Sequence, residues 1–154
     1  MKEKDEELTK RMVEHNDPLG VLQSMELKGI PVLLVEDNEL NREIAMELLE
    51  GAGLSPDYAE NGLESVYRLE QPDVKDYQLI FMDIQMPLMN GYDATKRIRE
   101  SKNEKIRDLP IIAMTADAFT QDVQKSMNVG MNEHIAKPLD LEKLIFILEK
   151  YLTK

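Results

Sequence analysis

The sequence predicts an α/β fold: a doubly wound, five-stranded parallel sheet with flanking helices. Two observations support this prediction. Short apolar runs alternate with amphipathic helical stretches from residue 30 onward, and each stretch between runs is long enough for a right-handed crossover. The clearest apolar runs are unbroken, which is typical of strands that are buried on both faces of a sheet.

The first half of this pattern contains two expected strands and two expected helices. An unbroken apolar run at residues 30–35 predicts the first strand, and residues 55–59 predict a weaker strand at an edge of the sheet. The helix between them is expected to end near Gly51, and Asn61-Gly62 opens the next helix. The residues of the first helix that we expect to face inward are Leu40, Ile44, Leu48 and Leu49.

The second half is organised around a short apolar run that ends on Asp83. Pro87 and the Asn90-Gly91 pair predict a loop directly after it, so the Asp83 carboxylate should face an opening shaped by backbone. A charged loop is expected near residues 102–109. The remaining expected elements are strands at 79–82, 110–114 and 133–136 and helices at 92–101, 118–129 and 140–152.

Composition narrows the classes of protein and partner. The chain has 154 residues, enough for one domain and a modest extension. Its net charge of −11 argues against nucleic acid or an anionic membrane as a direct partner, and its lack of cysteine excludes disulfides and thiolate chemistry. The charged start is unlike a secretory signal, and no apolar run approaches the roughly 18 residues of a membrane span. We therefore expect a soluble, cytoplasmic protein.

Residues 1–29 differ from the rest of the chain, and we expect an amino-terminal extension or linker followed by a domain at residues 30–154. Residues 2–14 are rich in Lys and Glu with a thin apolar stripe, too narrow for a core. A solvated helix, a docking arm or a linker from a longer chain would each fit, and we favour the linker. A second short stripe contains Leu19, Leu22 and Met25.

Polar residues stand where the expected strands end. Because these ends meet at one edge of a parallel sheet, ligands bind there in open α/β folds. Three carboxylates at one place repel each other unless a cation is bound, and an oxygen-only ligand set favours Mg²⁺. Mg²⁺ shares phosphate oxygens, so one carboxylate could act as a nucleophile and form an aspartyl phosphate. The residues are Glu36, Asp37, Asp83, Thr115 and Lys137.

Each of these residues also has an ordinary structural interpretation. Asp37 and Asp83 could cap the segments that follow them, since Asp is common at helix starts. Thr115 could be a strand-end hydroxyl and Lys137 a surface ammonium. Any one residue alone would favour the ordinary interpretation, whereas their joint placement at strand ends favours a site.

Four motifs carry a resemblance to a known family: VLLVEDN at 32–38, FMDIQMPLMNG at 81–91, MTA at 114–116 and AKPL at 136–139. From residue 30 to residue 152 the sequence resembles the receiver domain of two-component response regulators, most closely those of hybrid sensor kinases. The resemblance implies a flavodoxin-like sheet with strand order 2-1-3-4-5. It also implies a phosphoacceptor module whose partner is a histidine kinase or a histidine phosphotransfer domain.

The resemblance assigns roles to individual residues. Asp83 would accept the phosphoryl group from a phosphohistidine, with Mg²⁺ as the cofactor. The metal ligands would be Glu36, Asp37, Asp83 and the main-chain carbonyl of Gln85.

Four further positions follow from the same resemblance. Thr115 and Lys137 would bind the phosphoryl oxygens, and Thr115 would move on phosphorylation. A switch aromatic usually stands three residues before the lysine, but here that position is His134, which puts the usual rotamer switch in doubt. The alternative interpretation of His134 is an edge residue that packs on the last helix. We expect a cis peptide bond before Pro138, which would let Lys137 reach back over the sheet edge.

Two classes of function remain open. The first is the signalling module, a monomer or weak dimer that has at most self-phosphorylation and self-dephosphorylation activity. The second is a Mg²⁺-dependent phosphohydrolase with Asp83 as nucleophile, but Gln85 stands where such an enzyme would have a second Asp. The signalling module is favoured, and its donor should contact outward residues of the first helix such as Asn41.

Overall fold

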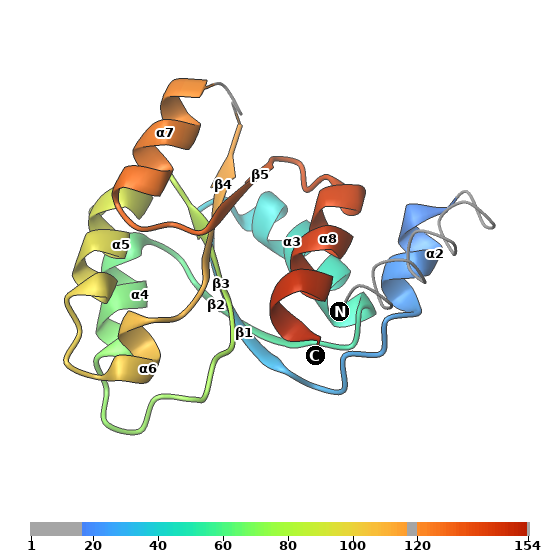
Figure 1. Cartoon of the computed structure of the whole chain (residues 1–154), viewed down its shortest axis with the longest axis horizontal. Coiled ribbons are helices and arrows are strands. Elements are labelled where there is room, and N and C mark those ends of the chain that lie inside the picture. The colour runs from blue at the N-terminus through green and yellow to red at the C-terminus, as the bar shows by residue number, and fades with distance from the viewer. Residues whose placement is uncertain (1–16, 117–119, 154) are drawn as a thin grey trace.

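The computed structural model describes residues 17–116 and 120–153 and contains one five-stranded parallel sheet (Figure 1). The strand order is β2-β1-β3-β4-β5, as expected, and β2 lies at an edge. Each expected strand is present within one residue of its predicted bounds. The strands are β1 (Pro31–Val35), β2 (Ser55–Ala59), β3 (Ile80–Asp83), β4 (Ile111–Thr115) and β5 (Glu133–Ala136).

Helices cover both faces of the sheet, which gives the doubly wound, three-layer arrangement (Figure 1). The helices α3 and α8 lie on one face, while α4, α5 and α6 cover the other. The described helices are α2 (Pro18–Gln23), α3 (Glu39–Gly51), α4 (Gly62–Leu69), α5 (Gly91–Arg99), α6 (Glu104–Arg107), α7 (Thr120–Asn128) and α8 (Leu141–Leu152).

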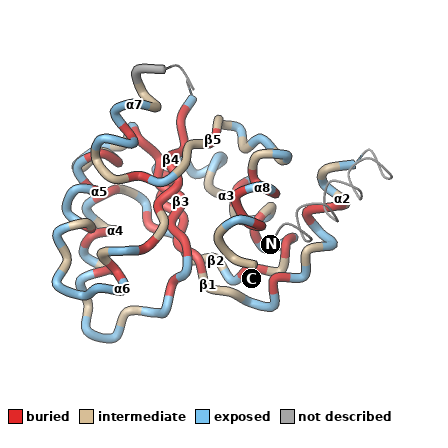
Figure 2. The backbone as a smooth tube through the Cα atoms, in the orientation of Figure 1, coloured by how far each residue is buried: buried red, intermediate tan, exposed pale blue. Residues whose placement is uncertain are grey.

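The unbroken apolar runs form the middle layer because successive strand residues point to opposite faces. In β1, Val32 and Leu34 join the core cluster under α3 and α8, whereas Leu33 and Val35 join the cluster on the other face. These side chains are fully buried, and Figure 2 shows the buried segments concentrated along the strands. The strands are apolar at every position because each of them contributes side chains to a separate core on each face of the sheet.

Asparagines fix the start of three helices near the carboxyl edge of the sheet. The side chains of Asn38, Asn61 and Asn90 each accept a hydrogen bond from the backbone N–H three residues later, at 2.8–2.9 Å. Such caps satisfy backbone donors that lack a partner within the helix. The caps therefore determine where α3, α4 and α5 begin.

The inward face predicted for α3 was partly wrong. Leu40 and Ile44 are 65% and 42% exposed, and Leu48 is only partly buried. The buried residues of α3 are Ala45 and Leu49, so the helix is rotated relative to the prediction. Ala45 and Leu49 join the core cluster, and Leu40 and Ile44 lie on the exposed side of the helix.

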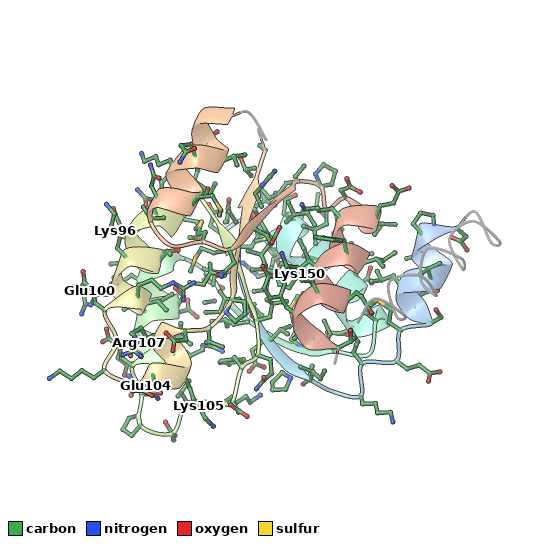
Figure 3. The ribbon with its side chains drawn as sticks, in the orientation of Figure 1. Lys96, Glu100, Glu104, Lys105, Arg107 and Lys150 are labelled. Carbon is green, nitrogen blue, oxygen red and sulfur yellow. The ribbon has the colours of Figure 1, made fainter. Side chains whose placement is uncertain are left out.

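The charged loop predicted near residues 102–109 contains a short helix, α6, so that prediction was also incomplete. Asn103 caps it, and Ile106 is its buried residue. The expected helix at 118–129 corresponds to α7, although residues 117–119 lie outside the described residues. In Figure 3, the labelled charged side chains of α5 and α6 point away from the sheet.

The structure describes the expected extension only from residue 17 onward. The stripe predicted within residues 2–14 lies outside the described residues. The following segment packs on the domain: Val21, Leu22 and Leu27 are buried in the same core cluster as α3 and α8 residues, and α2 contacts α8. Of the second predicted stripe, Leu22 is buried and Leu19 is 42% exposed. Among the described residues, the helices are all too short or too polar to cross a bilayer.

Candidate functional site

Strand register brings the predicted site residues to one edge of the sheet. Val35 of β1 pairs with Met82 of β3, so the residues that follow them, Glu36 and Asp83, lie side by side. Asp83 pairs with Met114, which places Thr115 just beyond. Thr115 in turn pairs with Ala136, and the next residue is Lys137. Neighbouring strands thus deliver residues that lie far apart in the sequence.

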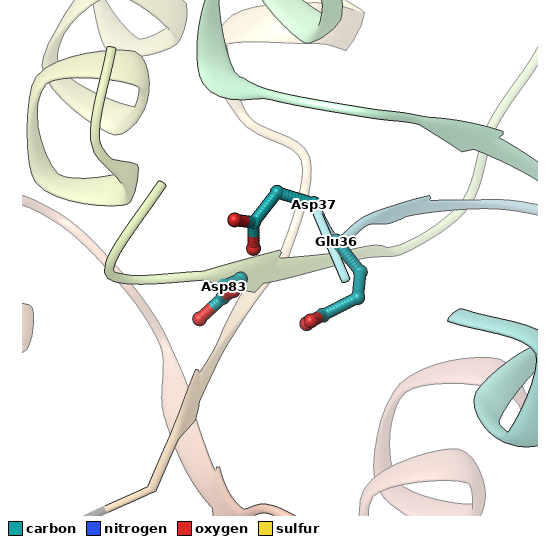
Figure 4. Close-up of side chains that lie close together, drawn as sticks. All are labelled: Glu36, Asp37 and Asp83. Carbon is teal, nitrogen blue, oxygen red and sulfur yellow. The ribbon is translucent and has the colours of Figure 1, made fainter. Parts of the chain in front are cut away.

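Three carboxylates converge at this edge (Figure 4). Glu36, Asp37 and Asp83 each place an oxygen within 4.8 Å of the others. Glu36 and Asp83 are 1% and 2% exposed, whereas Asp37 is exposed. The negative charge of the cluster is thus buried at Glu36 and Asp83 and accessible to solvent at Asp37.

Lys137 crosses the sheet edge to reach this cluster. Its Nζ lies 3.0 Å from Asp83 Oδ1 and 3.4 Å from Glu36 Oε2. The peptide bond between Lys137 and Pro138 is cis, as the sequence predicts. The backbone N–H of Lys137 also donates to the carbonyl of Thr115 at 2.8 Å, which ties its position to β4.

The crowding of charge shifts the acid–base properties of the site. Burial and the negative charge of Glu36 raise the pKa of Asp83 to about 7, and the contact with Lys137 offsets only part of this effect. Burial lowers the pKa of Lys137, but its contacts with Asp83 and Glu36 outweigh burial and raise that pKa above the ordinary value. Asp83 therefore carries an unfavourable charge that a cation would relieve.

The raised pKa of Asp83 predicts a pH-dependent stability of the metal-free protein. Between pH 3.8 and about 7 the folded protein keeps a proton that the unfolded chain has released, so the free energy of unfolding falls as pH rises. Asp83→Asn should therefore raise the free energy of unfolding by about 1–3 kcal/mol at about pH 8 and much less at about pH 4. Urea unfolding in the presence of a chelator measures both values, and equal changes at the two pH values would contradict the prediction.

A pocket adjoins Asp83 on the side of β4 and α7. Four of its lining residues were predicted from the sequence as site residues: Asp83, Gln85, Thr115 and Lys137. Thr115 is 6% exposed, and Gln85 is exposed in the loop after β3. The pocket, of about 90 Å³, is lined by Asp83, Ile84, Gln85, Met114, Thr115, Ala116, Asp122 and Lys137.

Gly91 shapes the loop beneath this pocket. A Cβ at Gly91 would collide with the carbonyl oxygen of Asp83 and approach Ile84 Cα to 3.0 Å. The Gly91 N–H donates to the Ile84 carbonyl at 2.8 Å, so the chain folds tightly back on the end of β3. A glycine at this position is thus required for the close approach that presents Asp83 and Gln85 to the opening.

Three further residues lie in or near the site: Asn41, Asp122 and His134. Asn41, expected to face a partner, is exposed and also donates its side-chain N–H to Glu36 Oε1 at 3.4 Å. Asp122 lines the pocket from α7, and no pattern in the sequence indicated this. His134 is half-buried on β5, an edge strand, and its part in a switch stays a prediction.

The donor set fits a magnesium ion. Its members are carboxylate oxygens, the ligands that Mg²⁺ prefers. Asp83 Oδ2 is buried without a hydrogen-bond partner among the described residues, although buried polar atoms normally have one. A bound cation would satisfy this oxygen and offset the repulsion between Asp83 and Glu36.

A family model described as "Response regulator receiver domain" matches residues 32–149. The chain belongs to the response regulator receiver family. As a receiver domain, it is a module of two-component signalling, and no finding supports the alternative phosphohydrolase.

Relatives of this receiver domain include proteins much longer than the chain. It is 38% identical to hybrid signal transduction histidine kinase G of Dictyostelium discoideum over 85% of the chain, which spans only 4% of that kinase. It is 41% identical to a two-component response regulator of Oryza sativa subsp. japonica, over 82% of the chain and 98% of that protein. The match therefore covers a small part of the kinase and nearly all of the response regulator.

Solved structures of receiver domains have the same fold. The receiver domain of a sensor histidine kinase from Pseudomonas aeruginosa, with magnesium coordinated in its active site cleft, is 34% identical. It matches with a TM-score of 0.72 over 82% of this chain and 99% of that one. The receiver domain of a Saccharomyces cerevisiae response regulator, crystallised with a histidine phosphotransfer signalling protein, is 30% identical. Its TM-score is also 0.72, over 81% of this chain and 90% of that one.

Proposed function

We propose that this receiver domain takes a phosphoryl group from a phosphohistidine onto Asp83 in a Mg²⁺-dependent reaction. The observation that carries the proposal is the convergence of three carboxylates and Lys137 beside an open pocket. The donor would be a histidine kinase or a histidine phosphotransfer domain. This proposal is supported by the yeast receiver domain that was crystallised with such a phosphotransfer protein.

The transfer replaces one phosphorus bond with another. An Asp83 carboxylate oxygen attacks phosphorus, the bond to the donor imidazole nitrogen breaks, and the electron pair stays on that nitrogen. Lys137 would bind a phosphoryl oxygen through its ammonium, and the Thr115 hydroxyl would donate to another. Glu36, Asp37, Asp83 and the Gln85 carbonyl would hold Mg²⁺, which neutralises charge on the phosphoryl oxygens when bound.

Stoichiometric transfer tests this function. The chain should remove the phosphoryl group from a phosphorylated histidine phosphotransfer domain when Mg²⁺ is present, and intact mass should show one added phosphoryl group. Addition of a chelator should stop the transfer. Repeated turnover of small phosphorylated metabolites, without a phosphorylated protein, would instead support the phosphohydrolase.

The exposed apolar residues of α3 are the surface we propose for the donor. Leu40 and Ile44 are one helical turn apart and both exposed, and α3 begins at Glu39, two residues after the acidic Asp37. Adjacent apolar side chains beside a reactive group favour a protein partner. This placement replaces the expectation that the two residues belong to the core.

Leu40→Gln should slow phosphotransfer from a histidine phosphotransfer domain by about tenfold, because an apolar contact of the encounter is lost. Phosphorylation by acetyl phosphate should be unchanged, since this small donor needs no docking surface. Tyr67→Gln on α4 is the matched control, because Tyr67 is 67% exposed and Leu40 is 65% exposed. Equal rates for Leu40→Gln and wild type with the protein donor would exclude this surface.

The remaining expectations belong to the same proposal. We propose that phosphorylation switches a partner-binding surface through Thr115 and His134, and that the module has at most self-phosphorylation and self-dephosphorylation activity. Residues 1–29 would form an extension before the receiver domain at 30–154, and α2 within it packs on α8 of that domain. A cytoplasmic location and a monomeric or weakly dimeric state complete the proposal.

A further inference from the structure

The pocket beside Asp83 contains a carboxylate that the acidic cluster does not include. Asp122 lines this pocket from α7, across from residues contributed by the sheet. Among the described residues, the carboxylates grouped within 4.8 Å of one another are those of Glu36, Asp37 and Asp83. Asp122 is therefore separate from the proposed metal ligands, although it lines the same pocket as Asp83, Thr115 and Lys137.

The surroundings of Asp122 lie within α7 and on the neighbouring helix α5. The Ser126 hydroxyl donates to the Asp122 carbonyl at 2.8 Å, within the same helix. On the neighbouring helix α5, burial and then the negative charge of Asp122 raise the pKa of the Tyr92 hydroxyl. Lys125 Nζ lies 4.6 Å from the centre of the Tyr92 ring, so a second residue of α7 approaches Tyr92. Asp122 thus adjoins both the pocket and Tyr92 of α5.

Before a cation binds, the charges of the protein groups around the pocket are unfavourable for an incoming anion. Its lining residues include two carboxylates, Asp83 and Asp122, and one cation, Lys137. Lys137 already lies 3.0 Å from Asp83 and 3.4 Å from Glu36, so its charge is shared. A phosphoryl group adds further negative charge to a pocket of about 90 Å³, within a few ångströms of the lining groups.

We propose that Asp122 opposes the phosphorylation of Asp83 by charge repulsion across the pocket, and so limits how fast and how fully the site is modified. The inference rests on the proposed function, because it concerns the same reaction at Asp83. It identifies Asp122 as a residue that tunes the reaction without being a metal ligand. The ordinary interpretation is that Asp122 merely stabilises the first turn of α7 through the helix dipole.

A matched pair of variants separates the two interpretations. Asp122 and Asp93 each occupy the third position of a helix, in α7 and α5, but Asp93 does not line the pocket. At low salt, Asp122→Asn should be phosphorylated by acetyl phosphate about three- to tenfold faster than wild type. Asp93→Asn should match wild type, and Asp122→Glu should stay close to it. The acceleration should shrink at high salt because salt screens the repulsion.

Three outcomes would overturn the inference: equal rates for Asp122→Asn and wild type, an acceleration that salt does not reduce, or the same acceleration in Asp93→Asn. A wild-type chain that accepts no phosphoryl group would instead contradict the proposed function. The repulsion is then tested by titrating the metal-loaded protein with beryllium fluoride. Asp122→Asn should bind this anion several-fold more tightly than wild type, and equal affinities would overturn the inference.

Discussion

The Asp83→Asn variant is expected to take no phosphoryl group from acetyl phosphate or from a phosphorylated histidine phosphotransfer domain. The amide of asparagine cannot supply the carboxylate oxygen that attacks phosphorus. The variant should nevertheless fold, because asparagine has the shape of aspartate and removes the unfavourable charge of a group that is 2% exposed. Loss of phosphorylation together with unchanged or increased stability would therefore identify the nucleophile.

Intact mass after incubation with donor and Mg²⁺ measures this loss directly. Asp73→Asn is the control, because it makes the same chemical change at an exposed aspartate in the segment before β3. The control should gain one phosphoryl group at the wild-type rate. An added phosphoryl group in Asp83→Asn would mean that another residue is the acceptor.

The sheet was predictable because its signal is local. Runs such as Leu33–Val35 are apolar at every position, and both faces of each strand are covered. An unbroken run can therefore be recognised as a strand without deciding which of its residues face the core. Strand ends follow from the same runs, which is why the convergence of Glu36, Asp83 and Lys137 could be expected before the register was known. The site depends on topology, and topology is strongly restricted in such folds.

Helix faces were harder to predict because two apolar stripes compete on α3. Of the residues predicted to face inward, Leu49 is buried and Leu48 is partly buried, but Leu40 and Ile44 are exposed and Ala45 is buried in their place. The size of the side chains favoured Leu40 and Ile44 over Ala45, since closeness of packing on the sheet depends on neighbours that the local sequence does not specify. Leu40 and Ile44, the two exposed residues, are therefore informative about binding and not about the core.

Long-range packing explains the other differences. The segment at α2 has only a thin apolar stripe, yet Val21 and Leu22 are buried because α8 lies against them. Asp122 is one of many acidic residues in the sequence, and only the packing of α7 on α5 brings it to the pocket. Features that arise from contacts between distant elements leave no local pattern to recognise.

Asp37→Ala should lower the affinity for Mg²⁺ by at least about tenfold, because it removes a charged oxygen ligand from the site of a hard cation. The effect of Asp37 on the pKa of Asp83 acts in the opposite direction to the loss of a ligand. Asp37, which has a carboxylate oxygen within 4.8 Å of one of Asp83, contributes least to the raised pKa of Asp83, after burial and the charge of Glu36. Removal of Asp37 should therefore leave Asp83 more fully ionised at neutral pH, which by itself would favour cation binding. A measured loss of affinity must then come from the missing ligand.

Calorimetric titration with Mg²⁺ at neutral pH measures the change. Lys137→Ala is the contrasting control: its ammonium lies 3.0 Å from Asp83 and 3.4 Å from Glu36, where it competes with a cation for both carboxylates. This variant should bind Mg²⁺ at least as tightly as wild type, although it loses a ligand for the phosphoryl group. If Asp37→Ala bound Mg²⁺ as tightly as wild type, Asp37 would not be a ligand, and the exposed member of the acidic cluster would need another explanation.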